Sequence, residues 1–264
     1  MEIQATGVTG TIGRHLAREV KPLRTDLSAG VSHFFDLSID RNSHLLHLAG
    51  LVGIQKCNED PVKSHLINVA GTSKLASSFA QRSQGVFIFV SSGHVYKPGP
   101  PKSDEDSVVQ PTNQYAQHKL EAELQLQNIF REFPNRLMIL RVFSILDWNT
   151  SEGSLGFTIT RAVNSGNVVE IPNSDDIRDF MKPVRIANAI IKIIKGKPRG
   201  GIFNLCSGLG LTVEQAVRRM CSEKGVTSSN LNFLPGNSAL PYLVGNNQKL
   251  LRHYPGLELS WSRA

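Results

Sequence analysis

The sequence predicts an α/β fold, with a doubly wound parallel sheet and a small C-terminal lobe. Three observations support this prediction: a glycine-rich turn near the start, runs of nearly all-apolar residues, and helical stretches between those runs. Strands that helices cover on both faces lack polar positions, which fits such runs. We expect residues 1–145 to form one domain, to which later segments return, and residues 146–264 to form mainly the lobe.

The first predicted strand covers residues 1–5, a tight turn runs from Gly7 to Gly13, and the opening helix covers residues 12–20. Glycines at Gly7, Gly10 and Gly13 let the backbone approach a pyrophosphate, whose charge then lies at the helix N-terminus. This predicts a Rossmann-like dinucleotide site. Because the spacing is G-x-x-G-x-x-G rather than G-x-G-x-x-G, a bare glycine turn remains the alternative for this segment alone.

Further along the chain, strands are predicted at residues 45–49, 86–90 and 137–142, and helices at residues 64–80 and 113–133. The run at 86–90 consists of β-branched and aromatic residues, the other two runs are largely apolar, and the stretches between the runs are long enough for crossover helices. This alternation is typical of a parallel sheet. It loosens beyond about residue 145, which places the small lobe there.

Charge indicates the kind of partner. The chain has 29 Lys and Arg against 22 Asp and Glu, a net charge of +7 and a pI near 9.5, so an anionic partner is expected. A dinucleotide, a nucleotide-activated substrate or a nucleic-acid backbone would each satisfy this charge. No run of lysines or arginines resembles a nucleic-acid-binding tail, so we favour small molecules over nucleic acid.

Composition also indicates where the protein acts. No apolar run is long enough to cross a bilayer and no leader precedes the first strand, so we expect a cytoplasmic protein that binds no membrane. Three scattered cysteines, Cys57, Cys206 and Cys221, fit reduced and packed thiols better than disulfides or a metal site. No metal is expected.

Tyr115 and Lys119 are the strongest candidates for chemistry. Residues four apart share one face of a helix, so the ammonium and the phenol can reach into one cleft. A phenol loses its proton near pH 10, and a nearby cation is expected to lower that pKa. Tyr115 is therefore a candidate proton shuttle.

The order of the motifs resembles a known family. In this sequence they read Thr6-Gly7-Val8-Thr9-Gly10-Thr11-Ile12-Gly13, His47-Leu48-Ala49-Gly50, Asn68-Val69-Ala70-Gly71-Thr72, Ser91-Ser92-Gly93-His94-Val95-Tyr96, Tyr115 with Lys119, and Arg178-Asp179-Phe180. They resemble the extended short-chain dehydrogenase/reductases, and more narrowly the NAD-dependent epimerase/dehydratase family of nucleotide-sugar enzymes. The resemblance covers most of the chain.

The resemblance implies roles for individual residues. Ser92, Tyr115 and Lys119 would be catalytic, with Ser92 bonding the substrate oxygen and Lys119 holding the nicotinamide ribose. Asn68 would brace the sheet near the active site. The implied cofactor is NAD, with NADP possible, and many relatives form dimers through helices that match residues 64–80 and 113–133. Besides Tyr115 and Lys119, the implied cofactor-binding residues are Gly7, Thr9, Gly10, Thr11, Ile12, Gly13, Asp36, Leu37, Leu48, Ala49 and Gly50.

Several residues differ from the family pattern, and these differences limit the reactions that are expected. Gly93 and His94 stand where dehydratases of the family carry Asp and Glu, which disfavours dehydration. His94 could act as an additional acid or base near neutral pH. Ser144 replaces an asparagine that contacts nucleotide-sugar phosphates, and Arg185 replaces an acidic residue. Together with Arg178, His94 and Ser144 are the candidate substrate-binding residues.

The segment between Gly13 and His47 is shorter than in the family, so one of its elements must be reduced. The acidic residue that would bind the ribose 2′-hydroxyl cannot be assigned there, because Arg24 and Asp26 argue in opposite directions. NAD is expected on the resemblance alone.

We therefore expect an NAD(P)-dependent oxidoreductase or epimerase that acts on a carbonyl or secondary alcohol of a nucleotide-activated sugar. Epimerisation at C4 or reduction of a keto sugar is favoured over dehydration. One alternative is a reductase or dehydrogenase of a small non-nucleotide carbonyl, which Ser144 would favour. Another is a non-catalytic nucleic-acid-binding or scaffold protein with this fold, against which Ser92, Tyr115 and Lys119 argue.

Overall fold

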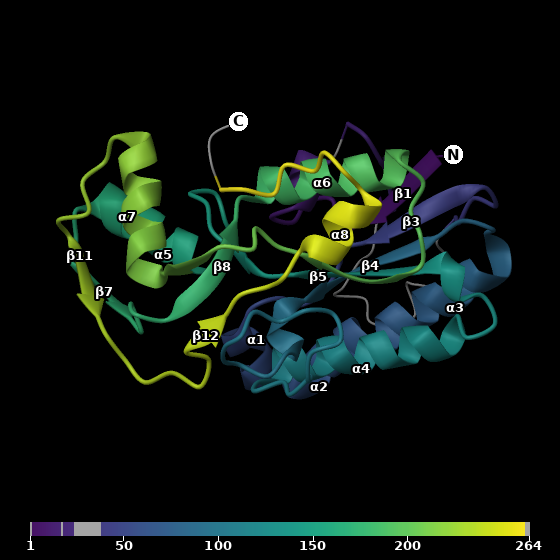
Figure 1. Cartoon of the computed structure of the whole chain (residues 1–264), viewed down its shortest axis with the longest axis horizontal. Coiled ribbons are helices and arrows are strands. Elements are labelled where there is room, and N and C mark those ends of the chain that lie inside the picture. The colour runs from purple at the N-terminus through teal and green to yellow at the C-terminus, as the bar shows by residue number, and fades with distance from the viewer. Residues whose placement is uncertain (1, 17, 24–37, 262–264) are drawn as a thin grey trace.

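The computed structural model describes residues 2–16, 18–23 and 38–261 (Figure 1). At its centre lies a sheet in which all the strands are parallel, in the order β2-β1-β3-β4-β5-β9. These strands are β1 (Glu2–Thr6), β2 (Lys21–Pro22), β3 (Ser43–His47), β4 (Phe87–Ser92), β5 (Leu137–Val142) and β9 (Gly201–Leu205). The predicted doubly wound parallel sheet is thus confirmed.

Helices cover both faces of this sheet, as Figure 1 shows. On one face, α6 (Pro183–Lys195) and α8 (Gln248–His253) pack with strand residues in the largest apolar cluster. On the other face, α3 (Thr72–Arg82) and α4 (Gln114–Ile129) pack on Phe87, Phe89 and Ile139. Because strands such as β4 and β5 are buried along their whole length, their nearly all-apolar sequences are explained.

The opening helix predicted over residues 12–20 is wrong. In the described part of this stretch, which omits residue 17, the only helix is the three-residue 3-10 helix η1 (Gly13–His15), and β2 begins soon afterwards. Lys21 of β2 pairs with Gln4, which lies two residues before the end of β1. The connection between the two strands therefore carries the chain back along β1 by only about two residues, roughly 7 Å. A nine-residue α-helix would carry it about 13 Å, which is too far. In the described part of the segment between Gly13 and His47, this helix is an element that is reduced.

The other predicted elements are present with shifted ends. The strand at 137–142 is as predicted, and β4 and β3 lie within two residues of the predicted runs. The helix predicted at 113–133 is α4. The helix predicted at 64–80 consists of α2 (Pro61–His65), a π-helix η3 (Leu66–Gly71) and α3.

A second apolar core organises the lobe. It contains α5 (Leu155–Ser165) and α7 (Val213–Lys224), with β7 (Val169–Pro172) paired in parallel to β11 (Leu231–Leu234). A small sheet in the order β10 (Gly210–Thr212), β8 (Ile177–Met181) and β12 (Tyr242–Leu243) joins it to the main sheet, and β6 (Ser144–Ile145) also pairs with β8. The domain boundary at residue 145 stays a prediction.

The three cysteines are buried and unbridged, as expected. None of the helices in the described ranges combines the length and the apolar character that crossing a bilayer requires.

Candidate active site

The candidate residues gather where three neighbouring strands end. The glycine turn follows β1, Leu48–Gly50 follows β3, and Ser92 ends β4. In open parallel sheets, ligands bind outside the carboxyl ends of the strands. The fold therefore brings the predicted cofactor-binding turn and the predicted catalytic serine to one edge.

The turn after β1 has the shape that a pyrophosphate requires. Gly7 has a φ of 70°, and a Cβ there would lie 2.5 Å from the backbone nitrogen of Ala49. A Cβ on Gly13 would collide with the Gly7 carbonyl oxygen. Thr11 and Ile12 have backbone N–H groups without a hydrogen-bond partner in the described part of the chain. Such a cradle fits a phosphate group, although η1 is too short to add a large helix dipole.

Other predicted cofactor residues lie in this turn or beside it. Thr9 and Gly10 are exposed in the turn, whereas Ile12 is buried beneath it. Thr11 Oγ1 lies 2.9 Å from Ser151 Oγ in the lobe. Asp36 and Leu37, and also Arg24 and Asp26, lie outside the described residues.

His47 holds the end of β3 next to the end of β1. Its Nδ1 is 2.7 Å from Thr6 Oγ1 and its Nε2 is 3.0 Å from Thr72 Oγ1. Burial, together with the charge of Lys119, lowers the pKa of His47 to about 3, so the ring is neutral. Because Thr6 Oγ1 also accepts the Ala49 N–H, the imidazole ties β1, β3 and α3 together next to the glycine turn.

The three predicted catalytic residues lie together. Tyr115 lies close enough to Ser92 for the serine side chain to act on the pKa of the phenol. Lys119 Nζ lies 6.0 Å from the centre of the Tyr115 ring and donates a hydrogen bond of 2.9 Å to the Val90 carbonyl. Asn113 caps α4 by accepting the Ala116 N–H, which fixes the turn that carries Tyr115. Their catalytic roles stay a prediction.

The expected lowering of the Tyr115 pKa by Lys119 is not found. Burial raises the pKa of Tyr115 to about 12, and the hydrogen bond to Ser92 offsets only part of this rise. Burial also lowers the pKa of Lys119 to about 8, although the carboxylate of Glu123 acts in the opposite direction. The phenol therefore holds its proton firmly at neutral pH.

Asn68 braces the loop after β3. Its Oδ1 accepts the Leu51 N–H at 2.8 Å and its Nδ2 donates to the Leu51 carbonyl at 2.9 Å. A Cβ on Gly50 would lie 2.8 Å from that Oδ1 and 4.0 Å from Lys119 Nζ. The π-helix around Asn68 thus positions Gly50 beside the ammonium.

His94 lies against Tyr115, with ring centres 6.4 Å apart in an edge-to-face arrangement. Burial lowers the pKa of His94 to about 4, and the charge of Arg178 contributes. The hypothesis of an acid or base that titrates near neutral pH is therefore wrong, because the imidazole is already neutral there.

The two other substrate candidates lie on the small sheet. Arg178 is on β8, where it forms an ion pair of 2.7 Å with Asp176, and Ser144 of β6 lies opposite Phe180 of β8. Asp179 accepts hydrogen bonds from the backbone N–H groups of Ser207 and Gly208, both at 2.8 Å, and so joins β8 to the segment after β9.

A buried ion pair beneath the site was missed from the sequence. Glu123 of α4 and Arg141 of β5 are 2.6 Å apart and almost fully buried, and Ser91 Oγ donates to Glu123 at 2.5 Å. One signal was available, because Glu123 follows Lys119 by four residues on the same helix face.

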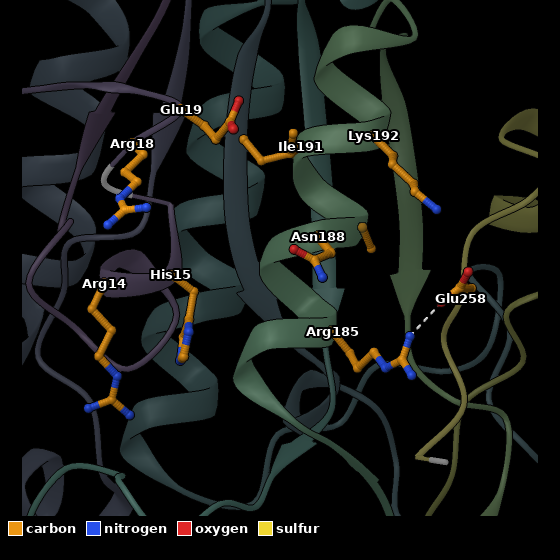
Figure 2. Close-up of a pocket in the computed structure, with 10 residues that line it drawn as sticks. Arg14, His15, Arg18, Glu19, Arg185, Asn188, Ile191, Lys192 and Glu258 are labelled. Carbon is orange, nitrogen blue, oxygen red and sulfur yellow. Dashed lines mark hydrogen bonds and ion pairs between the residues drawn. The ribbon is translucent and has the colours of Figure 1, made fainter. Parts of the chain in front are cut away.

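A groove of about 520 Å³ lies elsewhere, between the segment after Gly13 and α6 (Figure 2). None of the catalytic candidates lines it. Its two carboxylates are paired, Glu258 with Arg185 at 2.6 Å and Glu19 with Lys195 at 2.7 Å. Arg185, which stands where the family has an acidic residue, thus finds its partner in the C-terminal segment.

The sequence was also compared with those of known proteins. The GDP-6-deoxy-D-mannose reductase of Pseudomonas aeruginosa is 27% identical over 237 residues, which are 81% of this chain and 76% of the relative. The GDP-6-deoxy-D-talose 4-dehydrogenase of Aggregatibacter actinomycetemcomitans is 24% identical over 95% of this chain and 90% of the relative.

Among solved structures, RMD from Pseudomonas aeruginosa complexed with NADPH superposes with a TM-score of 0.82 and 22% identity, covering 99% of this chain and 95% of that chain. This likeness confirms the fold. The model of the family described as "NAD dependent epimerase/dehydratase family" matches residues 29–206, more than half of the chain. The resemblance found in the sequence is thereby confirmed, and with it the NAD-dependent character of the family. The chain therefore belongs to the NAD-dependent epimerase/dehydratase family.

Proposed function

We propose that this protein reduces the C4 carbonyl of a 6-deoxyhexose linked to GDP, with NAD(P)H as hydride donor. Support comes from the family and from the names of two relatives, a GDP-6-deoxyhexose reductase and a GDP-6-deoxyhexose 4-dehydrogenase. The observation that carries the proposal is that Ser92, Tyr115 and Lys119 lie together, with the Ser92 side chain beside a phenol that is protonated at neutral pH. A protonated phenol is the acid that carbonyl reduction needs.

In this proposal, the cofactor pyrophosphate is held by the turn from Gly7 to Gly13, and the nicotinamide ribose by Lys119. When bound, the reduced cofactor supplies a hydride to the carbonyl carbon. Ser92 donates a hydrogen bond to the carbonyl oxygen. Tyr115 gives its phenol proton to that oxygen, which completes the alcohol, and the phenolate regains a proton from solvent. The ammonium of Lys119 stabilises the phenolate in between.

Substrate binding is proposed to involve the lobe. The Arg178 guanidinium, held by Asp176, would bind the diphosphate, because arginine matches phosphate oxygens geometrically. Ser144 and His94 would contact the sugar. Dehydration remains disfavoured, since Gly93 and His94 offer no carboxylate beside Ser92.

We further propose a cytoplasmic homodimer. Three unbridged cysteines fit a reducing compartment. Val62, Leu66 and Leu124 are 71%, 47% and 59% exposed on α2, η3 and α4, the helices expected at a dimer interface. Burying such side chains between two copies would remove apolar area from water.

Turnover of GDP-6-deoxy-D-mannose with NAD or NADP, followed in the oxidative direction at 340 nm, tests the proposal. We expect turnover in the wild type and a fall of about 100-fold or more in Tyr115→Phe, since a positioned acid or base contributes about that much. Cofactor affinity, measured by calorimetry, should stay unchanged. Turnover of a small carbonyl but not of the GDP-sugar would support the non-nucleotide alternative, and biological activity unchanged by Tyr115→Phe would support a scaffold.

A further inference from the structure

The imidazole of His94 is partly buried beside the catalytic pair, and one of its ring nitrogens has no hydrogen-bond partner in the described part of the chain. Its Nδ1 is inaccessible to solvent and has no hydrogen-bond partner in the described ranges. Nε2 has no hydrogen-bond partner among the described residues either, but it is accessible to solvent. Buried polar atoms without a partner are rare and call for an explanation.

The backbone holds this side chain in place. His94 is in a 3-10 helix, η4 (Gly93–Val95), and its N–H donates to Ser92 Oγ at 3.2 Å. A Cβ on Gly93 would lie 2.8 Å from the ring of Phe143, so η4 packs tightly against the segment after β5. The ring is also in edge-to-face contact with Tyr115. These contacts fix the backbone at His94, and the ring can leave Tyr115 only by losing the edge-to-face contact.

The surroundings determine which nitrogen carries the proton. The ring is neutral at working pH, so it has one N–H donor and one lone pair. A buried N–H without an acceptor is rarer and costlier than a buried acceptor. The proton consequently belongs on the solvent-accessible Nε2, and the lone pair on the enclosed Nδ1. The nearby charge of Arg178 acts against a second proton.

We infer that His94 is a specificity-determining residue, which donates a hydrogen bond from Nε2 to the 3-hydroxyl oxygen of the sugar. This inference rests on the proposed function. In the proposed function Ser92 and Tyr115 bind the C4 oxygen, so a donor whose ring contacts Tyr115 would lie near the oxygen on a neighbouring ring carbon. C3 carries a hydroxyl in a 6-deoxyhexose, whereas C5 carries only the ring oxygen and the methyl group. A neutral donor binds this oxygen and removes no proton.

Paired probes and paired variants test the inference. The probes are GDP-6-deoxy-D-mannose and its 3-deoxy analogue, and kcat/KM is measured for both with the holoenzyme. The wild type should prefer the 3-hydroxyl probe by about tenfold or more, as expected for one lost hydrogen bond in a closed site. His94→Gln places an amide near Nε2 and should retain much of this preference. His94→Asn places it near Nδ1 and should reduce the preference to about twofold, because kcat/KM falls more for the 3-hydroxyl probe than for the 3-deoxy analogue.

Two results would overturn the inference. If kcat/KM of a variant falls by the same factor for both probes, the role of His94 is merely structural. If His94→Asn retains the preference for the 3-hydroxyl probe, the contact between His94 and the 3-hydroxyl group is excluded. Nitrogen NMR of the ring provides a readout without substrate, in which His94 should remain the neutral Nε2–H form from pH 6 to 8. Titration of His94 in that range, or the Nδ1–H form, would also overturn it. If neither probe is turned over, the proposed function fails, while the NMR result still decides the state of the ring.

Discussion

At the residue scale, the pKa values of the candidate catalytic residues depend on burial more than on the spacing of charged groups. The i, i+4 spacing of Tyr115 and Lys119 suggested an ammonium that lowers the phenol pKa, but burial raises that pKa to about 12 and lowers that of Lys119 to about 8. Both shifts favour the neutral form of each group. Tyr115 thus holds its proton at neutral pH, and the charge of Lys119 depends on pH within the working range.

The lowered pKa of Lys119 predicts a pH dependence of cofactor binding. The ammonium is present below about pH 8 and is lost as the pH rises through that value. Dinucleotide affinity, measured by calorimetry between pH 6.5 and 9.5, should therefore fall above pH 8. Lys119→Met should bind more weakly at low pH and show no such inflection. An inflection that persists in Lys119→Met would assign it to another group.

At the element scale, strand and helix positions could be predicted wherever a segment is buried on both faces or has a clear apolar pattern. The run at 137–142 is entirely buried, so its composition alone indicates the strand. The opening helix was predicted wrongly because its length depends on where β2 pairs with β1, which is a tertiary constraint. The pair of Glu123 and Arg141 was missed for the same reason, since the packing of α4 on β5 creates it.

The glycine turn predicts a matched pair of substitutions. Gly7 and Gly166 both have a φ of 70°, but only at Gly7 would a Cβ meet another atom, the backbone nitrogen of Ala49. Gly166→Ala should lower the free energy of unfolding by about 1 kcal/mol, the cost of a left-handed backbone. Gly7→Ala should lower it further and weaken dinucleotide binding at least about tenfold. Denaturant titration and calorimetry measure both, and equal effects of the two variants would refute a phosphate cradle.

The buried ion pair between α4 and β5 predicts a large effect on stability. Glu123→Gln leaves the Arg141 charge buried without its partner, so unfolding free energy should fall by about 3–5 kcal/mol. Replacing both residues with apolar ones of similar size should cost less than the single change. Glu132→Gln, which breaks the exposed pair with Arg131, should cost less than about 1 kcal/mol. If the double variant were the least stable of these proteins, the physical account of the pair would be wrong.

At the scale of the whole molecule, the exposed apolar side chains of α2, η3 and α4 predict how the protein associates. Leu124→Asp should convert the proposed dimer to a monomer, because a carboxylate would be buried at the interface. Val168, 75% exposed on the lobe, offers a control, and Val168→Asp should leave the molar mass unchanged. Light scattering after size exclusion measures both. A monomeric wild type would exclude the dimer outright.

The order of the strands has a consequence for synthesis of the chain. Strand β5 ends at Val142, but its outer neighbour β9 begins only at Gly201, after the whole stretch that builds α5, β8 and α6. In a nascent polypeptide that stops anywhere in this interval, Met138–Val142 has no neighbouring strand on its outer side. Such an unpaired, largely apolar edge can pair with other chains and so lead to aggregation. Truncations upstream of residue 201 should accordingly precipitate rather than yield a smaller soluble product.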